Sequence, residues 1–264
     1  MKLFDSHAHY YDERFEEEVD GGADAVLSSV FLGEVKKIVN VGTCNENSQK
    51  CIDQAARYGG MYAAVGIHPS DCRFYTDVER ELAILEQTLE NREAKKIVAL
   101  GEIGLDYHYE NTDKAKQAAF FEAQLEMAER LDLPVIIHDR EAHGDCMDII
   151  RRHRGVRGVF HSFSGSAEMA KELVRLGWYI SFSGVVTFKN AAKVKEAAAA
   201  VPLDRLMIET DCPYLAPHPH RGEINHSGLI CLTCEALAQI HGMELDEMAD
   251  ITYRNACNFF GIND

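Results

Sequence analysis

Two histidines separated by a single residue lie near the start of the chain, at His7 and His9. Side chains alternate faces along a β-strand, so in a strand both imidazoles point to the same side. Two neutral imidazoles directed at one point are suited to a transition metal. A lone His-x-His pair is equally consistent with two unrelated surface histidines. The interpretation therefore depends on what the rest of the chain provides.

Four more residues of metal-ligand type stand at the ends of later apolar, β-branched runs. These residues are Glu102, His138, His161 and Asp211. Each alone is more typical of a hydrogen-bonded surface group. If the runs are strands of one parallel barrel, however, their ends meet at a common rim and the side chains face a common centre.

Six ligands exceed the needs of one tetrahedral ion, so the set favours a pair of divalent ions. Glu102 is the candidate bridge, because its carboxylate has two oxygens. Two ions about 3.5–4 Å apart can clamp the attacking and the leaving oxygen of a displacement. Asp211 can ligate one ion and accept the proton of the attacking water, which requires an ionised carboxylate.

The elements that must position these residues follow a regular rhythm, in which short β-branched runs alternate with helix-length amphipathic runs. After the stretch 3–10, further strands are expected at 37–42, 61–66, 97–102, 134–138, 158–161, 179–183 and 206–211. Helices are expected at 13–34, 46–58, 77–93, 114–132, 141–154, 166–176, 190–200, 228–241 and 245–260. Such alternation predicts a parallel sheet with crossover helices.

The count of about eight strands is typical of a (β/α)8 TIM barrel, and we expect a single domain over residues 1–264. A doubly wound open sheet is the alternative architecture. The glycine-rich phosphate turn expected there after the first strand is replaced by His-Ala-His, which disfavours it.

Composition bounds the functions that the chain can have. Its 264 residues carry a formal net charge of −16, which argues against binding nucleic acid through a broad basic surface but not against local phosphate binding through metals. No run of about 18 apolar residues and no signal peptide are evident, so a cytoplasmic protein without membrane contact is expected. The eight cysteines lack the spacing of a disulfide framework and are expected to be mostly buried thiols.

Six sequence blocks together resemble the TatD family of metal-dependent deoxyribonucleases, which belongs to the amidohydrolase superfamily. The blocks are FDSHAHY at 4–10, GIHP at 66–69, GEIGLDY at 101–107, PVIIHDR at 134–140, HSFSG at 161–165 and ETDCPYLAP at 209–217. The resemblance covers nearly the whole chain in the family's order. It implies a barrel that binds divalent metal and hydrolyses DNA, with 3′-to-5′ exonuclease activity on single-stranded ends.

The resemblance also implies roles for individual residues. The family's metal ligands fall on the same six residues, His7, His9, Glu102, His138, His161 and Asp211. Its other pocket positions fall on His68, Asp106, Arg140 and Arg221. His68 is a candidate acid or phosphate ligand, Asp106 can orient a ligand histidine, and the two arginines can clamp a phosphate. Imidazoles suit zinc or manganese and oxygen ligands suit magnesium, so the identity of the two ions stays open.

Two features leave the substrate open. The family commonly continues after the arginine-glycine pair with basic residues and Arg-Asn-Glu-Pro, whereas this chain reads Glu-Ile-Asn-His-Ser at 223–227. Aromatic residues in or near the rim loops could stack on a nucleobase, although such residues more often only pack; they are Tyr107, Tyr109, Phe163 and Phe188.

The alternatives to a DNase are a metal-dependent hydrolase of amides, lactones or small phosphoesters, and an inactive metal-binding scaffold. An open pocket lined by arginine and aromatic groups favours a nucleic-acid strand, and a closed acidic pocket favours a small substrate. No obligate protein partner is evident from the sequence.

Overall fold

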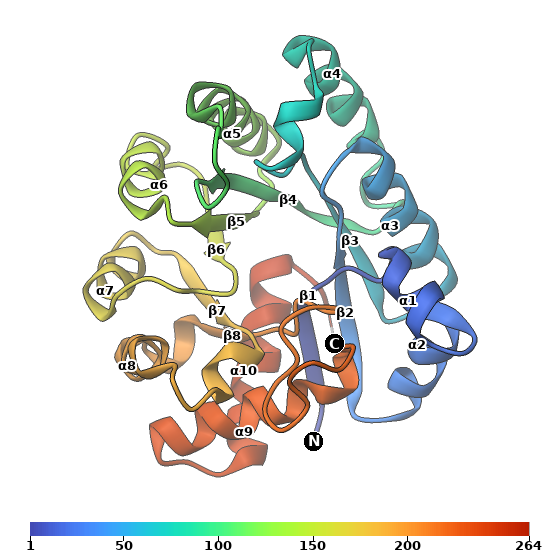
Figure 1. Ribbon diagram of the computed structural model, residues 1–264, viewed down its shortest axis with the longest axis vertical. Coiled ribbons are helices and arrows are strands. Elements are labelled where there is room, and N and C mark those ends of the chain that lie inside the picture. Colours follow the sequence, from blue (N-terminus) through green and yellow to red (C-terminus); the bar gives the residue numbers. More distant parts are fainter. Residues whose placement is uncertain (264) are drawn as a thin grey trace. The chain divides into compact units, whose positions relative to one another are not determined.

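The computed structural model describes residues 1–263, in which strands and helices alternate (Figure 1). The strands are β1 (Leu3–Ala8), β2 (Val35–Val41), β3 (Met61–Val65), β4 (Ile97–Asp106), β5 (Val135–Arg140), β6 (Gly158–Phe160), β7 (Tyr179–Phe182) and β8 (Leu206–Ile208). The helices are α1 (Glu13–Glu18), α2 (Gly22–Leu32), α3 (Asn45–Arg57), α4 (Val78–Thr88), α5 (Lys114–Leu131), α6 (His143–Ile150), α7 (Ala167–Arg175), α8 (Ala192–Ala200), α9 (Ile230–His241) and α10 (Leu245–Phe260). Four 3-10 turns complete the set: η1 (Asp71–Phe74), η2 (Gly184–Thr187), η3 (Leu203–Arg205) and η4 (Ser227–Leu229).

The eight strands form one parallel sheet in the order β1 to β8. With helices between successive strands this is the (β/α)8 TIM-barrel topology, as the alternation of the sequence predicts. The chain groups into two compact parts. The first part comprises Met1–Asn40, Gly59–Met61 and the residues from His161 onward, and the second comprises Val41–Tyr58 and Tyr62–Phe160.

In the first part, the first and last strands lie side by side. The Ser6 hydroxyl donates to the Ile208 carbonyl at 2.9 Å, and Ala8 forms a parallel bridge with Cys212 beyond the end of β8. The backbone continues this pairing, since the Asp211 N–H donates to the His7 carbonyl at 2.9 Å. The end of β1 is thereby fixed against the segment that follows β8.

Helix α10 packs against β1 and β8 with an apolar stripe at helical spacing (Figure 1). The rings of Tyr253 and Phe260 lie 6.1 and 5.8 Å from the ring of Phe4, which is fully buried. Burying a side chain of this size stabilises the fold by roughly 1.5–3 kcal/mol. The helix ends at Gly261, whose φ of 67° is the left-handed conformation that closes helices.

In the second part, two buried glutamines of α5 hold the ends of β3 and β4. The Gln117 amide exchanges two hydrogen bonds with the backbone of Asp106, at 2.9 and 3.0 Å. Gln124, two turns later, does the same for Ile67, at 2.8 and 3.1 Å. Both buried side-chain amides therefore have hydrogen-bond partners. These bonds hold the end of β4 at Asp106, and the residue before His68, against α5.

Strands β4 and β5 approach closely because Gly104 has no side chain. Gly104 pairs with His138, and a Cβ atom at Gly104 would lie 2.0 Å from the His138 carbonyl oxygen. The φ of Gly104 is 141°, a conformation that other residues rarely adopt. This one glycine therefore sets the position of His138.

The structure differs from the expected elements at several places. Strand β4 continues to Asp106, so Glu102 lies within the strand and not at its end as expected. The helix expected at 13–34 is divided into α1 and α2 at Gly21 and Gly22, whose φ values are 80° and 62°. Strands β6 and β8 end before His161 and Asp211, because Ser162 and Asp211 have positive φ values of 39° and 59° that no strand continues. Among the described residues, no helix is long and apolar enough to cross a membrane.

Candidate metal centre

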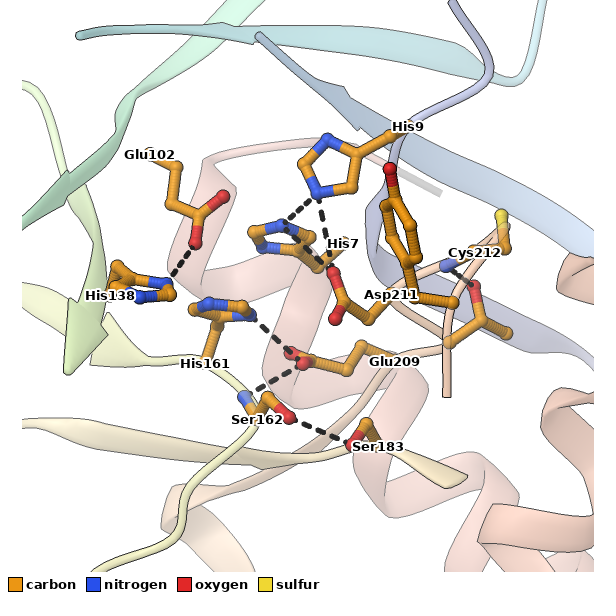
Figure 2. Close-up of polar contacts among 12 residues, drawn as sticks. His7, His9, Glu102, His138, His161, Ser162, Ser183, Glu209, Asp211 and Cys212 are labelled. Carbon is orange, nitrogen blue, oxygen red and sulfur yellow. Dashed lines mark hydrogen bonds and ion pairs between the residues drawn. The ribbon is translucent and has the colours of Figure 1, made fainter. Parts of the chain in front are cut away.

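Three of the expected ligands converge in the first part, at the end of β1 and after β8 (Figure 2). The Nε2 atoms of His7 and His9 lie 3.0 Å apart. Asp211 Oδ1 lies 3.7 Å from Nε2 of His7 and 3.3 Å from Nε2 of His9. His7 and His9 are buried, so three ligand atoms meet at one protected point.

These separations fit a metal ion. With bonds of about 2.0–2.1 Å, neighbouring ligand atoms of a tetrahedral site are roughly 3.3 Å apart. The three measured separations lie within about 0.4 Å of that spacing. Two imidazoles and a carboxylate are also a donor set that divalent transition metals use. The residues present therefore fit the metal that the sequence predicts.

The Asp211 carboxylate favours its charged form despite its surroundings. Burial disfavours ionisation, but the hydrogen bond with His9 and the charges of His161 and His7 outweigh burial and hold the pKa of Asp211 below its ordinary value. Its φ of 59° is uncommon for a residue with a side chain. Such backbone strain is concentrated at functional sites, where the surrounding contacts maintain it.

His161 lies beside the same group and is oriented by Glu209. The His161 ring stacks on the His7 ring, with the centroids 4.0 Å apart and the planes at 13°. Its Nδ1 lies 3.2 Å from Glu209 Oε1, which also accepts the Ser162 N–H at 2.7 Å. A carboxylate on one imidazole nitrogen fixes the tautomer and leaves the other nitrogen for a metal. Glu209 was missed by the sequence analysis, although it opens the ETDCPYLAP block.

Asp5, also missed, anchors the segment that precedes Asp211. Its fully buried carboxylate accepts hydrogen bonds from the Thr210 hydroxyl at 2.6 Å, the Thr210 N–H at 2.9 Å and the Ser227 hydroxyl at 2.6 Å. Burial raises the pKa of Asp5 to about 6, and these hydrogen bonds limit the rise. In the sequence Asp5 is an ordinary strand residue, and no local pattern marks it.

The second part carries another cluster, formed by His68 beyond the end of β3, Glu102 within β4 and His138 within β5. His138 Nδ1 lies 2.6 Å from Glu102 Oε1, as Figure 2 shows, and His68 Nε2 lies 3.6 Å from the same oxygen. The rings of His68 and His138 are 4.3 Å apart. Two imidazoles thus converge on one carboxylate oxygen, again a set that can hold a divalent ion. The structure thus places His68, expected as a pocket acid or phosphate ligand, beside the expected ligand pair Glu102 and His138.

Asp106 orients His138 in the way that Glu209 orients His161. Asp106 Oδ2 lies 3.2 Å from His138 Nε2 and accepts the Ser70 hydroxyl at 3.4 Å. Burial opposes its ionisation, but the hydrogen bonds from His138 and His108 N–H lower the pKa of Asp106 to about 2. Asp106 is therefore charged at neutral pH. Its place beside His138 is the one expected of a residue that orients this histidine.

Comparison with known proteins agrees with this arrangement. The sequence model described as TatD related DNase matches residues 4–261. The chain belongs to the TatD family. It is 38% identical to the uncharacterized metal-dependent hydrolase YabD of Bacillus subtilis, over 99% of this chain and 100% of YabD. It is 37% identical to YcfH of Escherichia coli K12, which has the same description, over 100% of this chain and 97% of YcfH.

The fold agrees as well. The crystal structure of YJJV, a TatD homolog from Escherichia coli K12, superimposes with a TM-score of 0.91 at 31% identity, covering 99% of this chain and 98% of that one. A TatD family hydrolase from Entamoeba histolytica shares the fold, with a TM-score of 0.87 at 22% identity over 99% of both chains. The chain is thus a metal-dependent hydrolase of the TatD family.

The two arginines that the TatD resemblance assigns to the pocket are exposed or nearly so, and each lies over an aromatic ring. The guanidinium carbon of Arg140 is 5.6 Å from the centre of the Tyr109 ring. That of Arg221 is 4.1 Å from the centre of the Phe188 ring. Both rings were expected in rim loops, and the arginines hold them by cation–π contact.

The loop that departs from the TatD pattern has a structural role. Buried Asn225 donates to the carbonyl oxygens of Thr210 and Tyr214, at 2.9 and 2.7 Å. Ser227 bonds to Asp5 and, through its N–H, to the Tyr10 hydroxyl at 3.0 Å. The side chains at 225 and 227 therefore support the segment around Asp211. Glu223, at the start of this loop, is exposed, and its Oε2 lies 2.8 Å from His220 Nδ1.

Proposed function

We propose that this protein is a divalent-metal-dependent deoxyribonuclease that removes nucleotides from single-stranded 3′ ends. The observation that carries the proposal is the convergence of histidines on carboxylates at the ends of strands, together with membership of the TatD family. In a (β/α)8 barrel the C-terminal strand ends form one rim, and we propose that both clusters serve one reaction there.

Two divalent ions, zinc, manganese or magnesium, would be held by the six expected ligands, Glu102 among them. Bound divalent ions supply Lewis acidity toward the phosphate and lower the pKa of the attacking water. The carboxylates of Glu209 and Asp106 keep the imidazoles of His161 and His138 oriented for this task.

The remaining steps belong to the protein's own side chains. Asp211, held ionised by its neighbours, accepts the proton of the attacking water at its carboxylate. Arg140 and Arg221 bind the non-bridging oxygens of the scissile phosphate, whose negative charge increases in the transition state. His68 donates a hydrogen bond to the same phosphate and assists the departure of the leaving oxygen.

The test is degradation of single-stranded oligonucleotides labelled at the 3′ or the 5′ end. Metal-stripped protein is refilled with magnesium, manganese or zinc, and the Asp211→Ala variant is run beside it. Release of the 3′ label first, dependent on metal and lost in the variant, is the expected result and identifies the working ion. Protein that binds about two metals yet releases no nucleotide with any ion would contradict the nuclease and favour a small-molecule hydrolase.

A further inference from the structure

A small cavity in the second part adjoins the cluster of His68, Glu102 and His138. It measures about 200 Å³, and its lining includes Ser70, Arg73, Tyr109, Lys116 and Gln117. Ser70 contacts the cluster directly, and Gln117 contacts Asp106 beside it. The Ser70 N–H donates to His68 Nδ1 at 3.1 Å and its hydroxyl to Asp106, while Gln117 holds the Asp106 backbone. A ligand in the cavity therefore lies next to residues proposed to act on the scissile phosphate.

Two exposed aromatic rings belong to the loops that line this cavity. Phe74 is 67% exposed and Tyr109 is 51% exposed, which is unusual for large rings among the described residues. Each carries an arginine: the guanidinium carbon lies 4.6 Å from the ring centre for Arg73 on Phe74, and 5.6 Å for Arg140 on Tyr109. The same loops thus present stacking surfaces with a positive charge beside each.

Charge in the cavity is balanced although the chain carries −16 overall. The lining holds two cationic residues, Arg73 and Lys116, and two acidic residues, Glu110 and Asp113. The Lys116 ammonium donates to the Tyr75 carbonyl at 2.9 Å. Asp113 is already engaged, because its carboxylate accepts the Lys116 N–H at 3.0 Å at the start of α5. Broad electrostatic attraction therefore cannot hold a polyanion here. Attachment must come from stacking and from a few directed arginine contacts.

We propose that this cavity, with Phe74 and Tyr109 beside it, binds one unpaired nucleotide of a single-stranded nucleic acid next to the nucleotide being cleaved. The substrate class rests on the proposed function. Pockets that enclose a whole drug-sized ligand measure roughly 300–1,000 Å³, so a cavity of this size holds part of a longer molecule. Stacking needs a base that is free of its duplex neighbours, which makes the subsite selective for single strands.

The experiment measures binding of fluorescent oligonucleotides with non-hydrolysable linkages, two to ten nucleotides long, to the metal-loaded protein. Loss of one stacked base weakens binding about 5- to 150-fold. We expect losses in this range for Phe74→Ala and Tyr109→Ala, with affinity restored in Tyr109→Phe.

Two variants serve as controls. Leu32→Ala removes a side chain that is 89% exposed and lies in α2, outside this cavity. Arg205→Ala removes a cation that lies 5.0 Å from the centre of the Tyr179 ring, at the N-terminal end of β7. Both should bind oligonucleotides as the wild type does.

A second measurement separates the subsite from the nuclease itself. Hydrolysis of bis(p-nitrophenyl) phosphate, a diester too short to reach a neighbouring subsite, should have an unchanged kcat/KM in Phe74→Ala, whose ring contacts Arg73 and none of the residues proposed to bind the scissile phosphate. Oligonucleotide affinity within twofold of wild type in both variants would overturn the subsite and leave the proposed nuclease standing. If instead the variants lose oligonucleotide affinity while the wild type cleaves no nucleic acid, the subsite is upheld and the nuclease is refuted. Equal loss of both activities would mean general damage and would also overturn the subsite.

Discussion

The Asp211 carboxylate combines a left-handed backbone with contacts to two buried imidazoles. The neighbouring segment is fixed by Asp5 through Thr210, so the carboxylate does not depend on its own interactions for its position. Asp211, the residue proposed to accept the proton, is therefore distinct from Asp5 and Thr210, which hold its segment in place. That separation allows a substitution at Asp211 to change chemistry without changing the fold.

We predict that Asp211→Asn lowers kcat at least about 100-fold, since general-base catalysis alone contributes 10²–10⁴-fold. Asparagine tolerates a left-handed backbone, so the far-ultraviolet circular dichroism should stay that of the wild type. The exposed Asp204→Asn is the control and should retain full activity. Turnover at the wild-type rate in purified Asp211→Asn would remove this residue from the mechanism.

Glu209 is a positioning residue, because it touches His161 and the Ser162 N–H. We predict that Glu209→Gln weakens metal binding or activity by about 10–100-fold, the usual effect of losing a carboxylate behind a ligand histidine. Metal affinity measured by competition with a chelator provides the readout, and Glu209→Asp should recover part of it. Unchanged metal affinity in both variants would show that Glu209 only supports the backbone.

Among the elements, the β4–β5 pair places His138 most directly, and Gly104 is the residue that permits it. We predict that Gly104→Ala costs about 1–3 kcal/mol of unfolding free energy or more, through a clash with the His138 carbonyl. It should also lower activity, because His138 moves. Gly144→Ala in α6 is the matched control: a Cβ there meets no atom within 4 Å, so urea denaturation should show no loss of stability.

The loop before α9 contains a partly buried histidine, His226, whose protonation affects the stability of the fold. Burial, with a contribution from His220, lowers the pKa of His226 below its ordinary value, and its Nδ1 accepts the Gly228 N–H at 3.1 Å. The unfolded chain then binds the proton more tightly than the folded protein does. Stability from this group is present above the ordinary pKa near 6.5 and is lost as pH falls below it.

We predict that His226→Gln loses less stability than the wild type between pH 7 and pH 5, measured by urea denaturation at each pH. Gln87→Asn, which changes an exposed residue of α4 that does not titrate, provides a comparison and should leave the pH dependence of the wild type in place. Identical slopes for wild type and His226→Gln would show that this histidine does not contribute to acid sensitivity.

At the scale of the whole molecule, the cysteines form no disulfide bonds. All eight are free, and five of them are buried: Cys51, Cys72, Cys146, Cys212 and Cys234. Burial raises the pKa of Cys72 and of Cys234 to about 12, which keeps the reactive thiolate scarce. We predict that a chromogenic disulfide reagent at pH 8 titrates at most three thiols in the native protein and eight in denaturant. Rapid reaction of more than three native thiols would contradict this burial.

Much of this molecule was predictable from its sequence, because the alternation of short apolar runs and amphipathic runs reflects the periods of strands and helices. This alternation also led to His7 and Glu102 as expected ligands, and the structure places each of them beside other residues that could bind metal. Glu209 and Asp5 were not, since their function comes from contacts with His161 and Thr210 that no local pattern encodes. The break at Gly21 and Gly22 was also missed, because the apolar spacing of α1 and α2 reads as one helix.

Asp5 and Thr210 are 205 positions apart in the sequence, so their hydrogen bond can form only late in translation. At about 5–20 residues per second, translation leaves Asp5 without its donors for roughly 10–40 s. The second part is encoded almost without interruption between residues 41 and 160 and is complete in that interval. The first part receives its closing segment only in the last quarter of synthesis. Pausing before codon 210 therefore prolongs the time that β1, which carries His7 of the candidate metal centre, remains without its partner segment.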